Sequence, residues 1–162
     1  MLDNNAKSSD AVASAVMANK GSEDAACARG FFVVECFDKD GNLKWTAESK
    51  NLVVNVGLQY MAGTSLDGAT ARITSWYIGL YGAGASNTPA ASDTLSSHAG
   101  WTEINPYTGN RPAATFTAAT NANPSVVTNS ASKAQYTITS AGPTTVGGAF
   151  LCSAASGTSG TL

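Results

Sequence analysis

Alternation of apolar and polar positions begins abruptly after Gly30 and predicts a β-hairpin. Residues 31–37 read FFVVECF and residues 43–48 read LKWTAE, and both runs are rich in the residue types that favour strands. The intervening DKDGN supplies Gly41 for a backbone turn with positive φ. This hairpin is the strongest local pattern in the chain.

Period-two spacing sorts the hairpin side chains into faces, because successive side chains of a strand point to opposite sides. The two groups on one face of each strand are Phe32, Val34 and Cys36, and Leu43, Trp45 and Ala47. We expect the core of the domain to include Phe32, Val34 and Trp45.

Residues 51–62 (NLVVNVGLQYMA) admit two interpretations. The apolar run could continue as a strand through Val54, whereas Asn55 could equally cap a short helix. We favour the helix, with Gly63 at its end.

Further strands are predicted along the rest of the chain. ITSWYIGLY at residues 73–81 is β-branched and aromatic, and Gly79 within it indicates a bulge or a close backbone approach. Additional strands are expected at residues 113–120, 134–139 and 145–153. Short strands separated by Gly, Pro and Asn turns predict an all-β domain over residues 29–162, an antiparallel β-sandwich or jelly roll with one short helix.

The N-terminal residues 1–28 differ from this domain, since they lack aromatic residues and are rich in Ala, Ser, Asn and Asp. One short helix is plausible from Asp10 or Ala11 to Asn19. Such a segment buries too little apolar surface to fold alone. We expect either a mobile tail or an N-terminal arm that orders against a partner.

At the other end, GTSGTL is turn-like and supplies no closing strand. A sheet left one strand short has an unpaired edge. The sequence therefore predicts either that another chain fills the edge or that the native chain continues past Leu162.

Composition argues against a catalytic, metal-binding or phosphate-binding site in the C-terminal part of the chain. Residues 101–162 carry three charged side chains, Glu103, Arg111 and Lys133, whereas 41 of these 62 residues are Ser, Thr, Ala, Gly or Asn. General acids, metal cages and phosphate clamps need ionisable or soft ligands. Small side chains instead suit strands that pack against neighbouring subunits, because ordering them costs little rotamer entropy.

Charge and cysteine content limit the classes of binding partner and indicate the compartment in which the protein is made. A formal net charge of −2 with nine scattered basic residues gives no reason to expect nucleic acid or an anionic membrane. Cys27, Cys36 and Cys152 are an odd, widely spaced set that fits reduced thiols in a protein made in the cytosol. We find no export signal and no apolar run long enough to span a bilayer.

Four candidate sites have ordinary structural explanations. His98 lies near Ser96, Ser97 and Glu103, but triad residues usually come from separate elements. Cys36 and Cys152 are expected to be small buried apolar groups. The DKDGN turn lacks the further ligands of a calcium loop. The aromatic residues could line a sugar platform, but most are expected in the core: Trp45, Trp76, Trp101, Tyr60, Tyr77, Tyr81 and Tyr107.

Taken in order, KDGNLKW, NLVVNVGLQYM, SWYIGLYG and DTLSSHAGWTEINPY with a following RPA resemble a family of small structural proteins of tailed bacteriophages. The resemblance covers about residues 30–162, and DTLSSHAGWTE at residues 93–103 is its most distinctive part. Members of the family continue beyond the GTL at residues 160–162. The Ala/Ser-rich segment before Arg29 lies outside the resemblance.

The resemblance implies a virion component without catalysis, made in the host cytoplasm. We expect a decoration or cement protein on the outside of the head, contacting the major capsid protein or other virion subunits and forming homo-oligomers. The alternative is a tail-fibre or head-fibre module that binds a receptor or glycan. No catalytic, cofactor-binding or metal-ligating residue is assigned, and no cofactor is expected.

Overall fold

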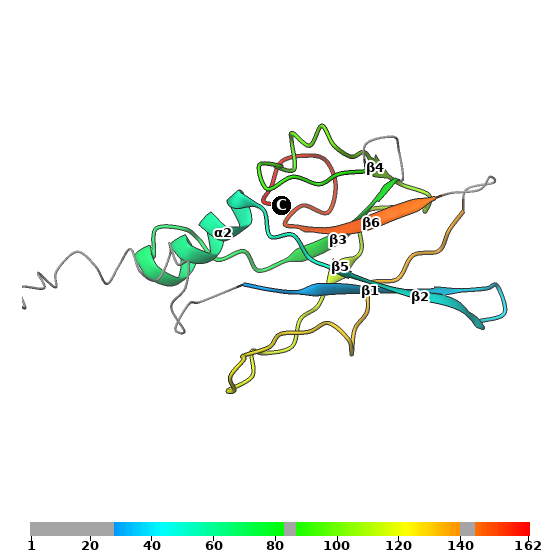
Figure 1. Ribbon diagram of the computed structural model, residues 1–162, viewed down its shortest axis with the longest axis horizontal. Coiled ribbons are helices and arrows are strands. Elements are labelled where there is room, and N and C mark those ends of the chain that lie inside the picture. The colour runs from blue at the N-terminus through cyan, green and yellow to red at the C-terminus, as the bar shows by residue number, and fades with distance from the viewer. Residues whose placement is uncertain (1–27, 83–86, 140–144) are drawn as a thin grey trace, which may run out of the picture.

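The computed structural model describes residues 28–82, 87–139 and 145–162. Its regular structure is mostly β-sheet with one short helix (Figure 1). The strands form two separate antiparallel sheets, a two-stranded hairpin and a four-stranded main sheet. The predicted helix between Asp10 and Asn19 lies outside the described residues.

The predicted hairpin is confirmed as β1 (Phe31–Phe37) and β2 (Leu43–Lys50). Gly41 has a φ of 84° and donates its N–H to the carbonyl of Asp38 at 3.2 Å. The pairing of Cys36 with Trp45 is followed by that of Phe37 with Leu43. Lys44 is therefore the extra residue of a β-bulge.

The predicted helix is confirmed as α2 (Asn55–Ala62), but both of its ends differ from the prediction. Val54 is the N-cap residue without a side-chain bond, and the Asn55 N–H donates to the carbonyl of Ala91 at 2.8 Å. Gly63 keeps a right-handed conformation, and the chain continues as the π-helical turn η1 (Gly63–Asp67). The turn stops at Gly68, whose φ of 64° no longer allows a helix.

The main sheet is built around β3 (Trp76–Gly82), which confirms the predicted aromatic strand with a later start. On one side β3 pairs with β6 (Val146–Cys152), the strand predicted at residues 145–153. On its other side it pairs with two short strands, β4 (Glu103–Ile104) and β5 (Ala113–Ala114). A Cβ at Gly79 would overlap the ring of Phe150, so the glycine permits a close approach.

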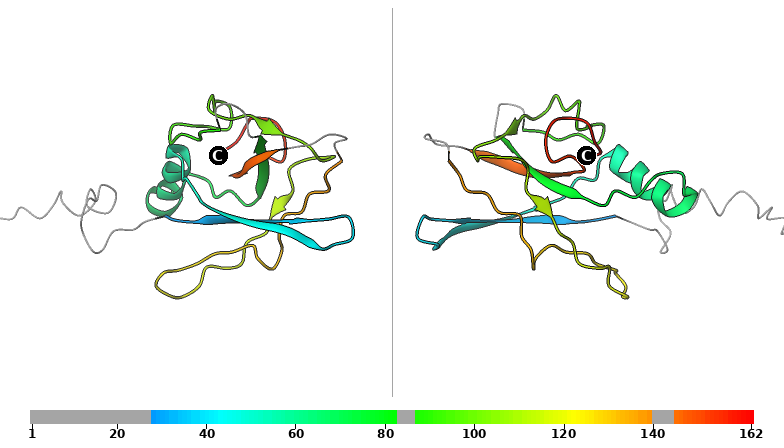
Figure 2. Two further views of the ribbon diagram at one scale, coloured as in Figure 1. Left: turned by 45° about the vertical axis from the view of Figure 1, so that its right-hand side comes forward. Right: turned by 180° about the vertical axis from the view of Figure 1, so that it is seen from behind.

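Two predicted strands are wrong in extent or in kind. Only Ala113–Ala114 of residues 113–120 is a strand, and residues 134–139 form only an isolated bridge between Ile138 and Tyr107. Between them the chain makes an irregular excursion that extends past the hairpin (Figures 1 and 2). Its legs are joined by single bonds such as Thr117 N–H to the carbonyl of Thr128 at 2.8 Å. Threonine side chains also accept backbone N–H groups here, which replaces a regular ladder.

The buried core lies in the main sheet and not in the hairpin. Leu95, Trp101, Phe150 and Cys152 form it, with Leu162 packed against them. The prediction that the core would include Phe32, Val34 and Trp45 is wrong, because Trp45 is 47% exposed and Phe32 and Val34 are only half-buried. Every residue of β2 is exposed. Periodicity identifies which side chains share a face, but it cannot tell whether another layer covers that face.

Candidate assembly surface

His98 is held by the residues of its own loop. Its ring stacks on Trp101 with centroids 3.8 Å apart, and Nδ1 lies 3.0 Å from the carbonyl oxygen of Trp101. The neighbouring carboxylate of Asp93 accepts the indole N–H of Trp101 at 2.9 Å. The hydroxyl groups of Ser96 and Thr94 share a hydrogen bond of 3.2 Å. The contacts of His98 stabilise the loop around Trp101.

The two described cysteines differ in access. Cys152 is fully buried and donates its thiol to the carbonyl of Ala154 at 3.3 Å. Burial raises the pKa of the Cys152 thiol, which disfavours the reactive thiolate. Cys36 is only half-buried on β1, so the expectation of a buried group is wrong for this cysteine. Cys27 lies outside the described residues.

The carboxylate of Asp38 is occupied by its own turn. It accepts the backbone N–H groups of Asp40 and Asn42, both at 2.9 Å, and the side-chain amide of Asn42 at 3.1 Å. The backbone bond from Asn42 is the main cause of a lowered pKa for Asp38. Over the described parts of the chain, no three His, Cys, Asp or Glu side chains gather closely enough to hold a metal ion.

The tryptophans lie in three different environments. Trp101 is in the core against Phe150, Trp76 meets Tyr60 edge to face at 5.6 Å, and Trp45 lies on the exposed hairpin. Trp45 is therefore the one exposed ring among the three that a sugar could stack on without displacing packed side chains.

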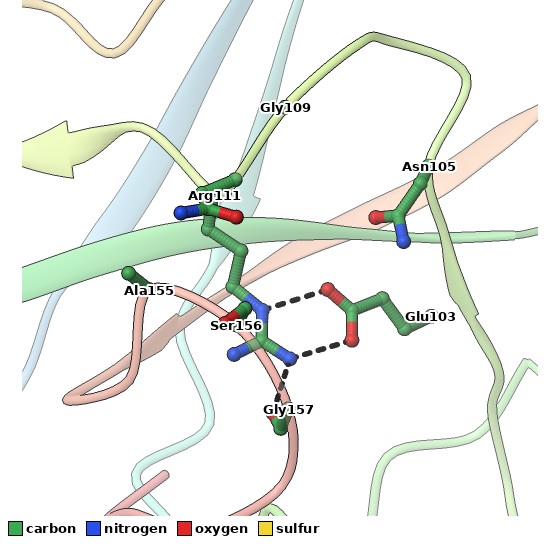
Figure 3. Close-up of a pocket in the computed structure, with 8 residues that line it drawn as sticks. Glu103, Asn105, Gly109, Arg111, Ala155, Ser156 and Gly157 are labelled. Atoms are coloured by element: carbon green, nitrogen blue, oxygen red, sulfur yellow. Dashed lines mark hydrogen bonds and ion pairs between the residues drawn. The ribbon is translucent and has the colours of Figure 1, made fainter.

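A shallow hollow beside the C-terminal segment is closed by a buried ion pair (Figure 3). Arg111, whose side chain is 3% exposed, donates two parallel bonds of 2.7 and 2.6 Å to the carboxylate of Glu103. The same guanidinium donates to the carbonyls of Ala154 and Gly157, both at 2.8 Å, and lies over the ring of Phe150. The bond to Glu103 is the main cause of a raised Arg111 pKa.

This ion pair ties the segment after β6 to the residues around β4 and β5, so it is structural. Sequence reasoning did not identify it. A signal was present, because Glu103 and Arg111 are two of only three charged residues after position 100 and flank one turn. Four of the five N–H groups of Arg111 already have partners, which leaves little capacity for an anionic ligand.

Several exposed apolar side chains lie on the hairpin. Exposed Phe31, Val33 and Phe37 lie on one face of β1, where Glu35 separates Val33 from Phe37, and exposed Leu43 pairs with Phe37. These four apolar side chains, which are 51 to 66% exposed, are called the hairpin's apolar face. The cross-strand partners of Phe31 and Val33 are charged, Lys50 and Glu48. A two-stranded sheet is marginally stable by itself, and exposed apolar side chains that gather on one face commonly mark contact surfaces.

Known protein families, curated protein sequences and solved structures were compared with the chain, and none matches it. In the part of the chain that the structure describes, no helix is both long enough and apolar enough to cross a membrane. The geometry of the described residues must therefore support any functional assignment.

Proposed function

We propose that this protein is a structural subunit of a tailed-bacteriophage virion, a decoration or cement protein that stabilises the head. Its partners are the major capsid protein or neighbouring virion subunits, together with other copies of itself. The observation that carries the proposal is the hairpin's apolar face, which is exposed in the isolated chain.

Covering that face is favourable, since burial contributes roughly 25 cal/mol per Å² of apolar surface. One subunit offers only a small patch, so a single contact would be weak. The symmetry of a shell repeats the contact many times, and linked weak contacts give strong overall attachment.

The same proposal accounts for the two separate sheets. Within the hairpin and within the main sheet, neighbouring strands are antiparallel, as they are in each sheet of a sandwich or jelly roll. We propose that the sandwich is completed in the assembled particle, where a neighbouring subunit covers the hairpin's apolar face.

The excursion between β5 and β6 suits a surface role as well. Its two legs are built mainly from Ser, Thr, Ala and Asn, and the described residues along it are mostly exposed. Lys133 reaches back to the carboxylate of Glu35 on β1 at 2.7 Å. The excursion is therefore attached to the hairpin and would be presented with it to a neighbouring subunit.

The test is binding to empty heads of the phage that carries this protein. The wild-type chain should bind saturably and raise the temperature at which the heads disassemble, measured by co-sedimentation and calorimetry. A double variant, Phe31→Ser with Val33→Thr, should weaken binding by about tenfold or more, because interface cores lose roughly 1 to 3 kcal/mol per large apolar group removed.

Leu66→Ser is the matched control, because Leu66 is equally exposed but lies on η1. It should leave head binding unchanged. Absence of saturable binding by the wild-type chain would overturn the proposal. Adsorption to host cells or glycans that Trp45→Ala abolishes, with the fold intact, would instead support a receptor-binding module.

A further inference from the structure

The outer edge of β2 has backbone groups that are directed away from the hairpin. The Asn51 N–H donates to the carbonyl of Gly30 at 2.9 Å, so position 51 faces β1. Backbone direction alternates along an antiparallel strand, so Ser49, Ala47 and Trp45 also face β1. The groups of Thr46 and Glu48 then point outward.

Lys44 is the bulge residue that has no partner on β1, so the ladder between β1 and β2 does not include it. All eight residues of β2 are exposed, and among the described strands only β1 pairs with β2. The backbone bonds that the described turns and loops make do not involve Lys44, Thr46 or Glu48. This edge can accept one more strand.

We propose that the added strand is β2 of a second copy of this chain, paired antiparallel about a two-fold axis at Thr46. In this register Thr46 lies opposite Thr46 of the second copy. Lys44 lies opposite Glu48 of the second copy, and the symmetry repeats that ion pair. Trp45 lies opposite Ala47 of the second copy, which places a large side chain beside a small one. Threonine pairs, opposite charges and matched sizes all favour cross-strand pairing.

The alternative registers are less favourable. An axis at Ala47 places Lys44 opposite Lys50 of the second copy, and an axis at Glu48 places two glutamates together. An axis at Trp45 leaves both Lys44 and Glu48 without an opposite charge. Since like charges across strands are destabilising, electrostatics select the axis at Thr46.

The other edge of the hairpin does not have this complementarity. An axis at Glu35 on β1 would place two carboxylates together, and Glu35 is already paired with Lys133 at 2.7 Å. Lysine on an edge strand ordinarily discourages pairing with other strands. On β2 the charges alternate in sign, so they discourage unrelated strands and fit a second β2.

The pairing would join two hairpins into a four-stranded sheet in the order β1, β2, β2, β1. Such a sheet exceeds the three strands that independent stability requires. The two-fold axis is perpendicular to the sheet, so the apolar faces of both hairpins lie on the same side. This dimer does not depend on the virion role, since it is a property of the chain in solution.

The test is a charge-swap cycle followed by sedimentation velocity over a wide range of protein concentration at low salt. The wild-type chain should form a dimer. Lys44→Glu and Glu48→Lys should each raise the dimer dissociation constant by about tenfold or more, because each places like charges opposite each other twice. The double swap should restore wild-type affinity.

Two further variants keep the test interpretable. Thr46→Pro removes an outward N–H that β1 does not use, so the hairpin should persist while the dimer is lost. Lys50→Glu makes the same charge change outside the proposed ion pairs and should have little effect. Circular dichroism checks that each variant is folded.

A wild-type chain that stays monomeric at every concentration would overturn the inference. So would any assembly that persists in folded Thr46→Pro, or a double swap that remains as weak as the single swaps.

Discussion

Arg111 is the residue whose loss the fold should tolerate least. Arg111→Met leaves the carboxylate of Glu103 and two backbone carbonyls without their donor. Breaking a buried pair in this way should lower the free energy of unfolding by about 3 kcal/mol. Urea denaturation followed by circular dichroism measures the change.

Lys133→Met is the matched control for Arg111, because Lys133 also pairs with a glutamate but is largely exposed. Exposed pairs contribute about 0 to 1 kcal/mol. Equal destabilisation by the two variants would contradict a special structural role for Arg111.

For single residues, burial was easier to predict from the sequence than the side chain that each residue contacts. It indicated that Cys152 would be buried, which the structure confirms. It could not show that the ring of His98 would stack on Trp101, because that contact depends on the path of the loop between them. The pairing of Glu103 with Arg111 was missed for the same reason.

Among the strands, the sharpest constraint is the close approach of β3 and β6 at Gly79. Gly79→Ala would place a methyl group into the ring of Phe150. Overpacking of this kind should cost about 1 to 3 kcal/mol. The measurement is the thermal unfolding of Gly79→Ala beside that of the control Gly30→Ala, where the nearest atom is 3.7 Å from the added carbon.

Phe150→Leu provides a second check on Gly79, because a smaller side chain would make room for the methyl group. Neighbouring residues couple, so the double variant should be more stable than the sum of the single effects predicts. Strict additivity would show that the contact with Phe150 is not the cause.

Elements with a clear apolar period were predicted well, and polar elements were not. The runs FFVVECF, WYIGLYG and VGGAFLC all form strands in the structure. AATFTAAT and AQYTIT alternate weakly, and their hydroxyl groups can satisfy backbone N–H groups without a ladder. The segment around residue 136 is instead fixed by one side chain, since the Tyr136 hydroxyl donates to the carbonyl of Ile78 at 2.7 Å.

At the scale of the whole molecule, the position of the core could not be predicted from the sequence. Both sheets offer alternating apolar faces, and only the main sheet has a fully buried one, covered by Leu95 and Trp101 from the loop between β3 and β4 and by the C-terminal segment. Coverage is a long-range property that local periodicity does not encode.

This unequal coverage predicts unequal stability within one chain. Amide hydrogens of β3 and β6 should exchange with solvent only through global unfolding, because these strands flank the buried core. Amides of β1 and β2 should exchange at lower free energy, because their two-stranded sheet is exposed. Hydrogen exchange followed by mass spectrometry or NMR measures both sets together.

The dependence of hydrogen exchange on protein concentration should differ between the hairpin and the main sheet. If β2 pairs with a second copy, the outward amides of Thr46 and Glu48 should gain protection as concentration rises, while β3 stays unchanged. Glu48→Lys should abolish that gain without altering β3. Equal protection of both sheets at every concentration would show that the hairpin is already stabilised within a single chain, which would remove the physical reason for an unfilled β2 edge.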